Sequence, residues 1–157
     1  GRTVRSLAWM LTLYKNMTLY FVAPEPLQIG QDILDLLEAA GTNYVVTDDF
    51  ASMLPIADAI YMTRIQDEWD AAGESSTLDT SSFRIGAEHL DLIKSTTAIM
   101  HPLPRRQEIS TEIDNDPRAV YWRQMRNGMW IRAALILTTF GRQNEVNKYY
   151  DDYKPEV

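Results

Sequence analysis

The sequence predicts an α/β fold, because short apolar runs typical of buried strands alternate with segments that have the apolar spacing of helices. The chain has 157 residues, of which 45% are hydrophobic, so it is long enough to form one ordinary domain with its own core. No internal repeat and no linker rich in Gly, Ser or Pro divides it. Because parallel strands need long crossover connections, the alternation indicates a mostly parallel sheet covered by helices on both faces.

The first elements are two cycles of helix and strand. Residues 2–14 are predicted to form a helix because apolar side chains recur at helical spacing, at Val4, Leu7, Ala8 and Leu11. Residues 17–22 are apolar and favour β structure, and a proline-containing loop stops this strand. The second cycle is a helix around residues 33–37, which Gly41 closes, and a strand at 44–46.

The next elements continue the alternation. A short helix at 50–54 precedes a strand at 59–62, and a helix at 86–94 precedes a strand at 97–100. Between these two units, the small, polar and acidic stretch 71–82 is the best candidate for a mobile loop.

The C-terminal part is predicted to be helical from residue 117 to a point before Gly141. Residues 142–157 show no clear period and are expected to form a loose tail or an extra contact. Together these elements predict a three-layer α/β/α architecture with a Rossmann-like sheet and a C-terminal helix, in which residues 1–141 form one domain.

The composition excludes several classes of function. With 15 Lys and Arg against 22 Asp and Glu, the formal charge is -7, so nucleic acids and anionic membranes are not expected as partners. No stretch approaches the roughly 20 apolar residues of a membrane-spanning helix. There is no Cys and only two His, which argues against disulfides and a metal site. The absence of an apolar signal core predicts a cytoplasmic protein.

Residues that follow the strands are the first candidates for a site, because parallel sheets bind ligands at the carboxyl ends of their strands. Arg64 follows the strand at 59–62 and carries a planar set of donors that suits a carboxylate. Gln66 adds an amide donor, and the pair would suit a small anionic substrate. A local ion pair between Arg64 and Glu68 is the alternative, and the spacing leaves both interpretations open.

The segment 101–105 follows the strand at 97–100. Pro102 and Pro104 fix φ and remove two N–H donors, and the rigid carbonyl oxygens that remain suit an amine. The alternative is a stiff loop whose carbonyls face water and whose His101 is a satisfied, half-buried side chain.

Two groups of arginines are interpreted differently. Arg2 lies at the start of the opening helix, where unpaired N–H groups and the helix dipole favour an anion. The arginines near the C-terminus are interpreted as structural, because arginines on a terminal helix usually pair with acidic neighbours or with another subunit. They are Arg118, Arg123, Arg126 and Arg132.

Four sequence motifs carry a family resemblance: Gly1-Arg2-Thr3-Val4-Arg5-Ser6-Leu7, Tyr61-Met62-Thr63-Arg64-Ile65-Gln66, His101-Pro102-Leu103-Pro104-Arg105 with Glu108-Ile109, and Asp116-Pro117-Arg118-Ala119-Val120-Tyr121-Trp122-Arg123-Gln124. In this order and spacing they resemble the aspartate-binding domain of the aspartate carbamoyltransferase family, over about residues 1–141. Ornithine relatives typically carry Cys at the position of Pro102 and lack the Thr-Arg-Ile-Gln string. Pro102, Arg64 and Gln66 therefore favour aspartate.

The resemblance implies transfer of a carbamoyl group from carbamoyl phosphate to L-aspartate in pyrimidine synthesis, with no cofactor and no metal. The side chains of two arginines and one glutamine would hold the substrate carboxylates, and two backbone carbonyls would orient the amine and the carbamoyl group. No catalytic residue is assigned within this half. The implied substrate-binding residues are Arg2, Arg64, Gln66, Leu103, Pro104 and Arg105. Glu68 would support Arg64 without contacting the substrate itself.

The motifs depart from the family pattern at Arg5, Asp67, Trp69 and the pair Arg106-Gln107. These positions neighbour the implied contacts, so we expect them to affect the affinity for aspartate and the closure of the loop after Gln66. They leave two alternatives open: a carbamoyltransferase for another amino acid, and a noncatalytic domain for assembly or regulation.

The family also has an N-terminal half that binds carbamoyl phosphate through a loop of Ser-Thr-Arg-Thr type, and that sequence does not occur in these 157 residues. The resemblance thus implies that the chain is a fragment, a cleaved piece or one product of a split gene, and that it is inactive alone. We expect it to work with the missing half in a homotrimer. A regulatory subunit or a dihydroorotase are further candidate partners.

Overall fold

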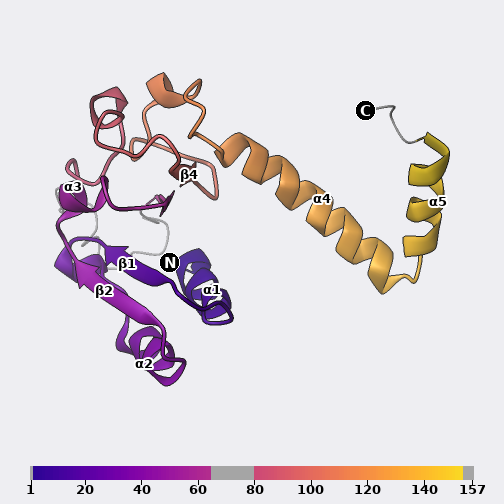
Figure 1. The fold of residues 1–157 in the computed structure, drawn as a ribbon, viewed down its shortest axis with the longest axis horizontal. Coiled ribbons are helices and arrows are strands. Elements are labelled where there is room, and N and C mark those ends of the chain that lie inside the picture. The colour runs from indigo at the N-terminus through magenta and orange to yellow at the C-terminus, as the bar shows by residue number, and fades with distance from the viewer. Residues whose placement is uncertain (1, 65–79, 154–157) are drawn as a thin grey trace.

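The computed structural model describes residues 2–64 and 80–153 (Figure 1). Its first part alternates helices and strands as predicted, in the order α1 (Arg2–Leu11), β1 (Thr18–Val22), α2 (Gln31–Ala39) and β2 (Asn43–Thr47). The strands β1 and β2 pair in parallel, with Thr18 opposite Asn43 and Val22 opposite Thr47. This confirms the expected parallel pairing.

The helices α1 and α2 cover one face of the β1–β2 pair. Ala8, Ile33 and Leu37 are buried there, and they pack against Leu19 and Phe21, which alternate along β1. The helix α2 ends where the sequence predicts, because Gly41 adopts a φ of 65°, in the left-handed region that favours glycine.

The second part holds α3 (Phe50–Met53), β3 (Ala59–Tyr61) and β4 (Ala98–Met100), together with single turns of 3₁₀ helix at η1 (Glu25–Leu27), η4 (Ala87–His89) and η5 (Thr111–Ile113). The strands β3 and β4 also pair in parallel, with Ala59 opposite Ala98 and Tyr61 opposite Met100. A one-residue bridge between Ile99 and Ala119 continues the pairing on the far side of β4.

The strands form two parallel pairs in the described part of the chain, and not one continuous hydrogen-bonded sheet. Side-chain packing connects the pairs, because Val22 at the end of β1 packs against the core that lies beneath β3 and β4. This core contains Leu54, Ile85, Ile99, Ile109, Ile113 and Tyr121, each at most 1% exposed. The α/β class is therefore as predicted, while the single sheet is replaced by two pairs that share apolar contacts.

The prediction of a helix at 86–94 is wrong, because only the 3₁₀ turn η4 forms there. The apolar residues of this segment anchor a loop: Ile93 is buried in the core. Arg118 closes the loop, since its Nη1 donates to the carbonyl oxygens of Leu90 and Ile93 at 2.7 Å each. Asp116 holds the same guanidinium at 2.8 Å, which agrees with the structural role predicted for Arg118.

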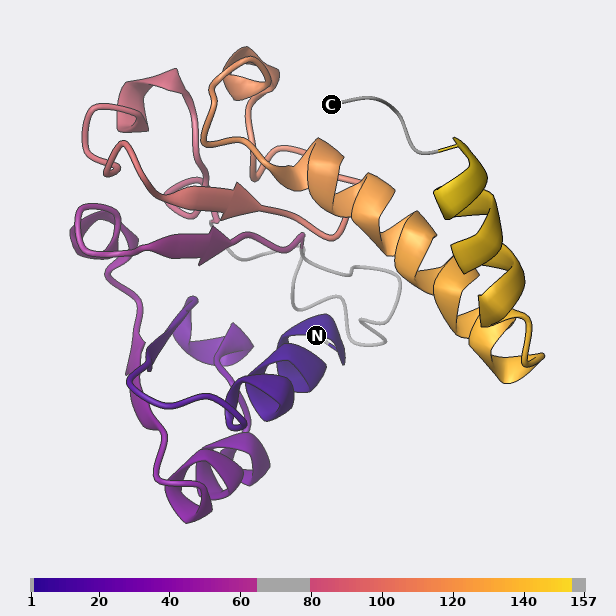
Figure 2. The ribbon, with the colours of Figure 1, turned by 45° about the vertical axis from the view of Figure 1, so that its right-hand side comes forward.

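The C-terminal region consists of α4 (Tyr121–Thr139), which extends away from the strands, and α5 (Gln143–Tyr153), which turns back from the far end of α4 (Figures 1 and 2). The expected loose tail at 142–157 is wrong for its first part, because α5 occupies 143–153. Gly141, with a φ of 65°, ends α4 and allows the reversal.

The surface of α4 is unusual because large apolar side chains are exposed around most of the helix. None of the helices in the described ranges is both long and apolar enough to cross a bilayer. A helix that is apolar on several sides normally lies inside an assembly or a larger core. The exposed residues are Trp122, Met125, Met129, Trp130, Ile131, Leu135 and Ile136 of the helix and Phe140 directly after it.

Candidate substrate-binding site at the ends of strands β3 and β4

The register of β3 and β4 brings two of the predicted site segments together. Tyr61 lies opposite Met100, and the amide of Met62 donates to the carbonyl of Met100 at 3.0 Å, so Arg64 and His101 follow the strands at the same edge. Burial chiefly lowers the pKa of His101, and the nearby positive charge of Arg64 contributes to that shift. The expectation that the arginine and the proline-rich segment share one edge is confirmed.

Arg2, the other predicted site arginine, lies on a different element. It is the first residue of α1, and the N-terminal end of α1 lies on the side toward which β3 and β4 point (Figure 2). Gln66 and Glu68, like Asp67 and Trp69, lie outside the described residues, as does most of the loop predicted at 71–82. Their roles stay predictions.

The turn after β4 has an unusual backbone. The Leu103–Pro104 peptide bond is cis, and Leu103 has a φ of 53°, which a residue with a side chain rarely adopts. A positive φ at a residue with a side chain persists only where surrounding contacts fix it. Within residues 2–64 and 80–153, no backbone amide donates to the carbonyl oxygen of Leu103 or Pro104. The binding of a substrate amine by these two carbonyls stays a prediction.

His101 is completely buried and fixes this turn from inside. The amide of Leu103 donates to its Nδ1 at 2.8 Å, so Nδ1 is the acceptor and Nε2 must carry the proton. That Nε2–H donates to Oε1 of Glu108 at 2.7 Å. The backbone amide of His101 donates to Oε1 of Gln124 on α4 at 3.0 Å. His101 is thus a hydrogen-bonded structural histidine in its neutral form. The alternative interpretation of the sequence predicts a satisfied side chain, although it expects His101 to be half-buried and not fully buried.

The neutral state of His101 makes stability depend on pH. Burial lowers the pKa of His101 below its usual 6.5, and the positive charges of Arg105 and Arg64 lower it further. The hydrogen bond with Glu108 raises the pKa, but burial has the larger effect. The unfolded chain therefore binds more protons than the folded chain as the pH falls below about 6.5, and the free energy of unfolding decreases in that range. We expect urea midpoints to decrease between pH 7.5 and pH 5.5, before the carboxylates titrate. A midpoint that stays constant over this interval, with an NMR pKa of 6.5 or above for His101, would contradict this assignment.

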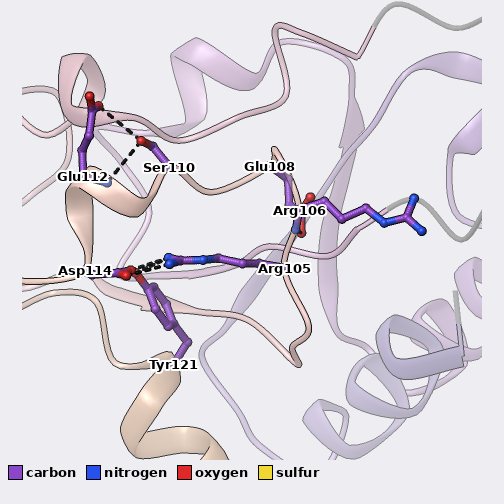
Figure 3. Close-up of polar contacts among 7 residues, drawn as sticks. All are labelled: Arg105, Arg106, Glu108, Ser110, Glu112, Asp114 and Tyr121. Atoms are coloured by element: carbon purple, nitrogen blue, oxygen red, sulfur yellow. Dashed lines mark hydrogen bonds and ion pairs between the residues drawn. The ribbon is translucent and has the colours of Figure 1, made fainter.

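Arg105 is engaged within the protein (Figure 3). Its Nη2 donates to Oδ2 of Asp114 at 2.6 Å, and its Nη1 forms a second bond to the same carboxylate and one to the hydroxyl of Tyr121 at 3.1 Å. The guanidinium also lies 5.5 Å from the ring centroids of Tyr121 and Trp122. The hydrogen bond with Arg105 lowers the pKa of Asp114, and burial raises the pKa of Tyr121 to about 12.

This geometry changes the role that we give to Arg105. A substrate carboxylate would have to compete with Asp114 for both terminal nitrogens of the guanidinium. Arg105 instead connects the turn after β4 to Tyr121, the first residue of α4. Sequence reasoning missed Asp114 and Tyr121, because no regular spacing relates residues that a loop brings together.

The departure from the family pattern at Arg5 has a local explanation. Its guanidinium donates to Asp32 of α2, with Nη1 3.0 Å from Oδ1. The ion pair connects α1 to α2 at the protein surface, where side chains of both residues are largely exposed.

A comparison with known proteins identifies the family to which the chain belongs. The family model described as "Aspartate/ornithine carbamoyltransferase, Asp/Orn binding domain" matches residues 1–139. The chain belongs to this family of aspartate and ornithine carbamoyltransferase domains.

Individual carbamoyltransferases are also similar to this chain. Aspartate carbamoyltransferase of Oryza sativa subsp. japonica, named chloroplastic, is 40% identical over 139 residues, which are 87% of this chain and 38% of the relative. The aspartate carbamoyltransferase catalytic subunit of Vibrio cholerae is 41% identical over 136 residues, 87% of this chain and 44% of the relative.

A solved structure agrees with both relatives. Aspartate transcarbamoylase from Trypanosoma cruzi, solved with carbamoyl phosphate and aspartate, superposes with a TM-score of 0.78 at 35% identity, covering 87% of this chain and 46% of that one. The chain therefore spans less than half the length of the carbamoyltransferases that it matches.

Proposed function

We propose that this chain is the aspartate-binding part of an aspartate carbamoyltransferase. In the proposed reaction the neutral amine of L-aspartate forms a bond to the carbonyl carbon of carbamoyl phosphate, the bond from that carbon to the phosphate oxygen breaks, and the attacking nitrogen loses one proton to the departing phosphate. The products are N-carbamoyl-L-aspartate and phosphate, and all their atoms come from the two substrates, so the reaction needs no cofactor. The observation that carries the proposal is the meeting of Arg64 and the 101–105 turn at one edge of β3 and β4.

The proposed roles follow from the chemistry of each group. The guanidinium groups of Arg2 and Arg64 hold the two carboxylates of the substrate, with Gln66 as a further donor. The carbonyl oxygens of Leu103 and Pro104 accept hydrogens of the amine, which leaves its lone pair directed at the carbamoyl carbon. Fixing both ends of aspartate replaces a bimolecular encounter by an oriented one, and such positioning can contribute several kcal/mol to rate acceleration.

Carbamoyl phosphate requires a second half in this proposal, whether on the same polypeptide or on a separate one. The apolar surface of α4 supports a larger assembly, because a helix that is apolar on several sides is normally covered. We propose a homotrimer as the working form, in the cytoplasm. A plastid location, as in the name of the plant relative, is the alternative.

Reconstitution tests the proposed function. The chain is mixed with a separately produced carbamoyl-phosphate-binding half, and formation of N-carbamoyl-L-aspartate is measured with aspartate and with ornithine as acceptors. We expect turnover with aspartate by the mixture and none by either component alone, because each holds one substrate.

Each outcome of the reconstitution has a meaning. Turnover with ornithine but not with aspartate would establish a carbamoyltransferase for another amino acid. If neither acceptor is carbamoylated, and calorimetry shows no binding of a bisubstrate phosphonate analogue, the result would favour a noncatalytic domain. Turnover by the chain alone would show that the second half is dispensable.

A further inference from the structure

Glu108 holds the turn at residues 101–106 at two points. One oxygen of its carboxylate, Oε1, accepts from Nε2 of His101 at 2.7 Å and from the backbone amide of Arg106 at 3.0 Å. The Glu108 side chain is only 13% exposed, so these hydrogen bonds are largely shielded from water. Glu108 therefore contacts the residue that begins the turn and the residue that ends it.

The backbone around Glu108 gives this carboxylate a rigid base. The amide of Ile85 donates to the carbonyl of Glu108 at 2.9 Å, and the amide of Ser110 donates to the carbonyl of Ile85 at 2.8 Å. The neighbouring Ile109 is buried in the core opposite Ile85. A side chain on such a base can fix its partners, whereas one on a free loop would move with them.

The contact passes from Glu108 to the backbone of Leu103 through the imidazole. Because Glu108 accepts the Nε2 proton, Nδ1 of His101 is left as an acceptor, and it takes the amide of Leu103 at 2.8 Å. This hydrogen bond acts on the residue whose φ of 53° sets the direction of the following carbonyl groups. Without Glu108, the Leu103 amide alone would favour this tautomer, and the Nε2–H would have no acceptor to fix the orientation of the ring.

We propose that Glu108 is a positioning residue, which acts through His101 and the Arg106 amide to hold the Leu103 and Pro104 carbonyls in the orientation that receives the substrate amine. This role rests on the proposed function. Glu108 does not touch the substrate in this arrangement. Its effect is on the geometry of the groups that do.

The experiment compares Glu108→Ala, Glu108→Gln and the control Glu112→Ala in the reconstituted enzyme. Glu112 lies four residues further along, and its side chain contacts Ser110 and not the turn (Figure 3). We expect Glu108→Ala to lower kcat/KM for aspartate by about 10- to 100-fold, mainly through a higher KM, with an unchanged KM for carbamoyl phosphate. Glu108→Gln retains an acceptor for both N–H groups, so we expect it to recover to within about threefold of wild type.

A second measurement uses the 157-residue chain alone. In ¹⁵N NMR we expect His101 to be protonated at Nε2 in the wild type and the Leu103 amide to exchange slowly with solvent. Both features should be lost in Glu108→Ala and retained in Glu108→Gln. A loss of folded protein without a positioning role would lower the apparent kcat per total protein and would leave the KM values for aspartate and carbamoyl phosphate unchanged.

The results separate this proposal from the proposed function. An aspartate KM for Glu108→Ala within twofold of that for Glu112→Ala would overturn the positioning role. Absence of turnover by the wild-type mixture with aspartate would overturn the proposed function, and the NMR measurement would then test the role of Glu108 alone. Unchanged His101 and Leu103 signals in Glu108→Ala would refute the positioning role. Loss of these signals in Glu108→Ala, with recovery in Glu108→Gln, would support it.

Discussion

Replacing Arg64 by Ala is expected to lower kcat/KM for aspartate in the reconstituted enzyme by roughly 100-fold. A charge-assisted hydrogen bond from a guanidinium to a carboxylate contributes about 1.5–3 kcal/mol, and each 1.36 kcal/mol corresponds to a factor of ten in rate. Arg64 follows β3 at the edge where the 101–105 turn also lies, so its loss removes one of the proposed contacts to a substrate carboxylate. Steady-state kinetics with varied aspartate measures the change.

The matched control for Arg64 is Arg84→Ala. Arg84 is half-exposed and lies 3.4 Å from Glu88, its partner one turn away, so its removal should leave the kinetics unchanged. Arg64→Lys separates charge from shape, because lysine retains the charge but lacks the planar pair of donors, and we expect an intermediate value. If Arg64→Ala behaves like Arg84→Ala, Arg64 is only a local ion-pair partner.

Replacing Asp114 by Ala is expected to lower the free energy of unfolding by about 3 kcal/mol, the low end of the range for breaking a buried ion pair, because the Asp114 side chain is 29% exposed. The side chain of Arg105 is 13% exposed, so the change leaves a largely buried guanidinium without its carboxylate. The hydroxyl of Tyr121, whose side chain is fully buried, loses its acceptor at the same time. Urea denaturation at pH 7 measures the loss.

Asp58→Ala is the control for this variant. Asp58 also forms an ion pair, with Lys94 at 2.9 Å, but its side chain is 92% exposed and its removal should have little effect on the free energy of unfolding.

Denaturation at acid pH gives a second test of the Arg105–Asp114 ion pair, because Arg105 holds the pKa of Asp114 below its usual 3.8. The ion pair therefore contributes in full above pH 3.8, and its contribution is lost as the pH falls through the lowered pKa. Equal denaturation midpoints for the two variants at pH 7 would refute the structural role of Arg105.

The elements with regular apolar spacing could be predicted from the sequence. The strands β1 and β4 and the helix α2 appear where apolar runs and Gly41 place them, because burial of regular elements imposes those patterns. The segment 86–94 has a similar spacing, but there the apolar residues anchor a loop that Arg118 closes. Spacing alone does not distinguish these two cases.

The prediction for the C-terminal tail failed for a different reason. Helical spacing does relate four residues of this segment, Val146, Tyr149, Tyr150 and Tyr153. The many polar residues between them make this apolar pattern weak. The helix α5 also lies beyond the residues 1–139 that the family model matches, so the resemblance gave no guidance there.

The candidate site was predictable in part. The edge shared by Arg64 and the 101–105 turn follows from the rule for parallel strands, which needs only the order of the elements. The tautomer of His101 and the pairing of Arg105 with Asp114 depend on contacts between residues that only the folded chain brings together. These contacts decide whether a group is available to a ligand.

The apolar surface of α4 also has a practical consequence for anyone who purifies the chain. At low ionic strength, the charge of -7 on each copy opposes contact between copies. Concentrated ammonium sulfate screens that repulsion and strengthens hydrophobic association, so a salting-out step would drive the helices together. Buffers of low ionic strength would therefore suit the purification of this chain better than a salting-out step.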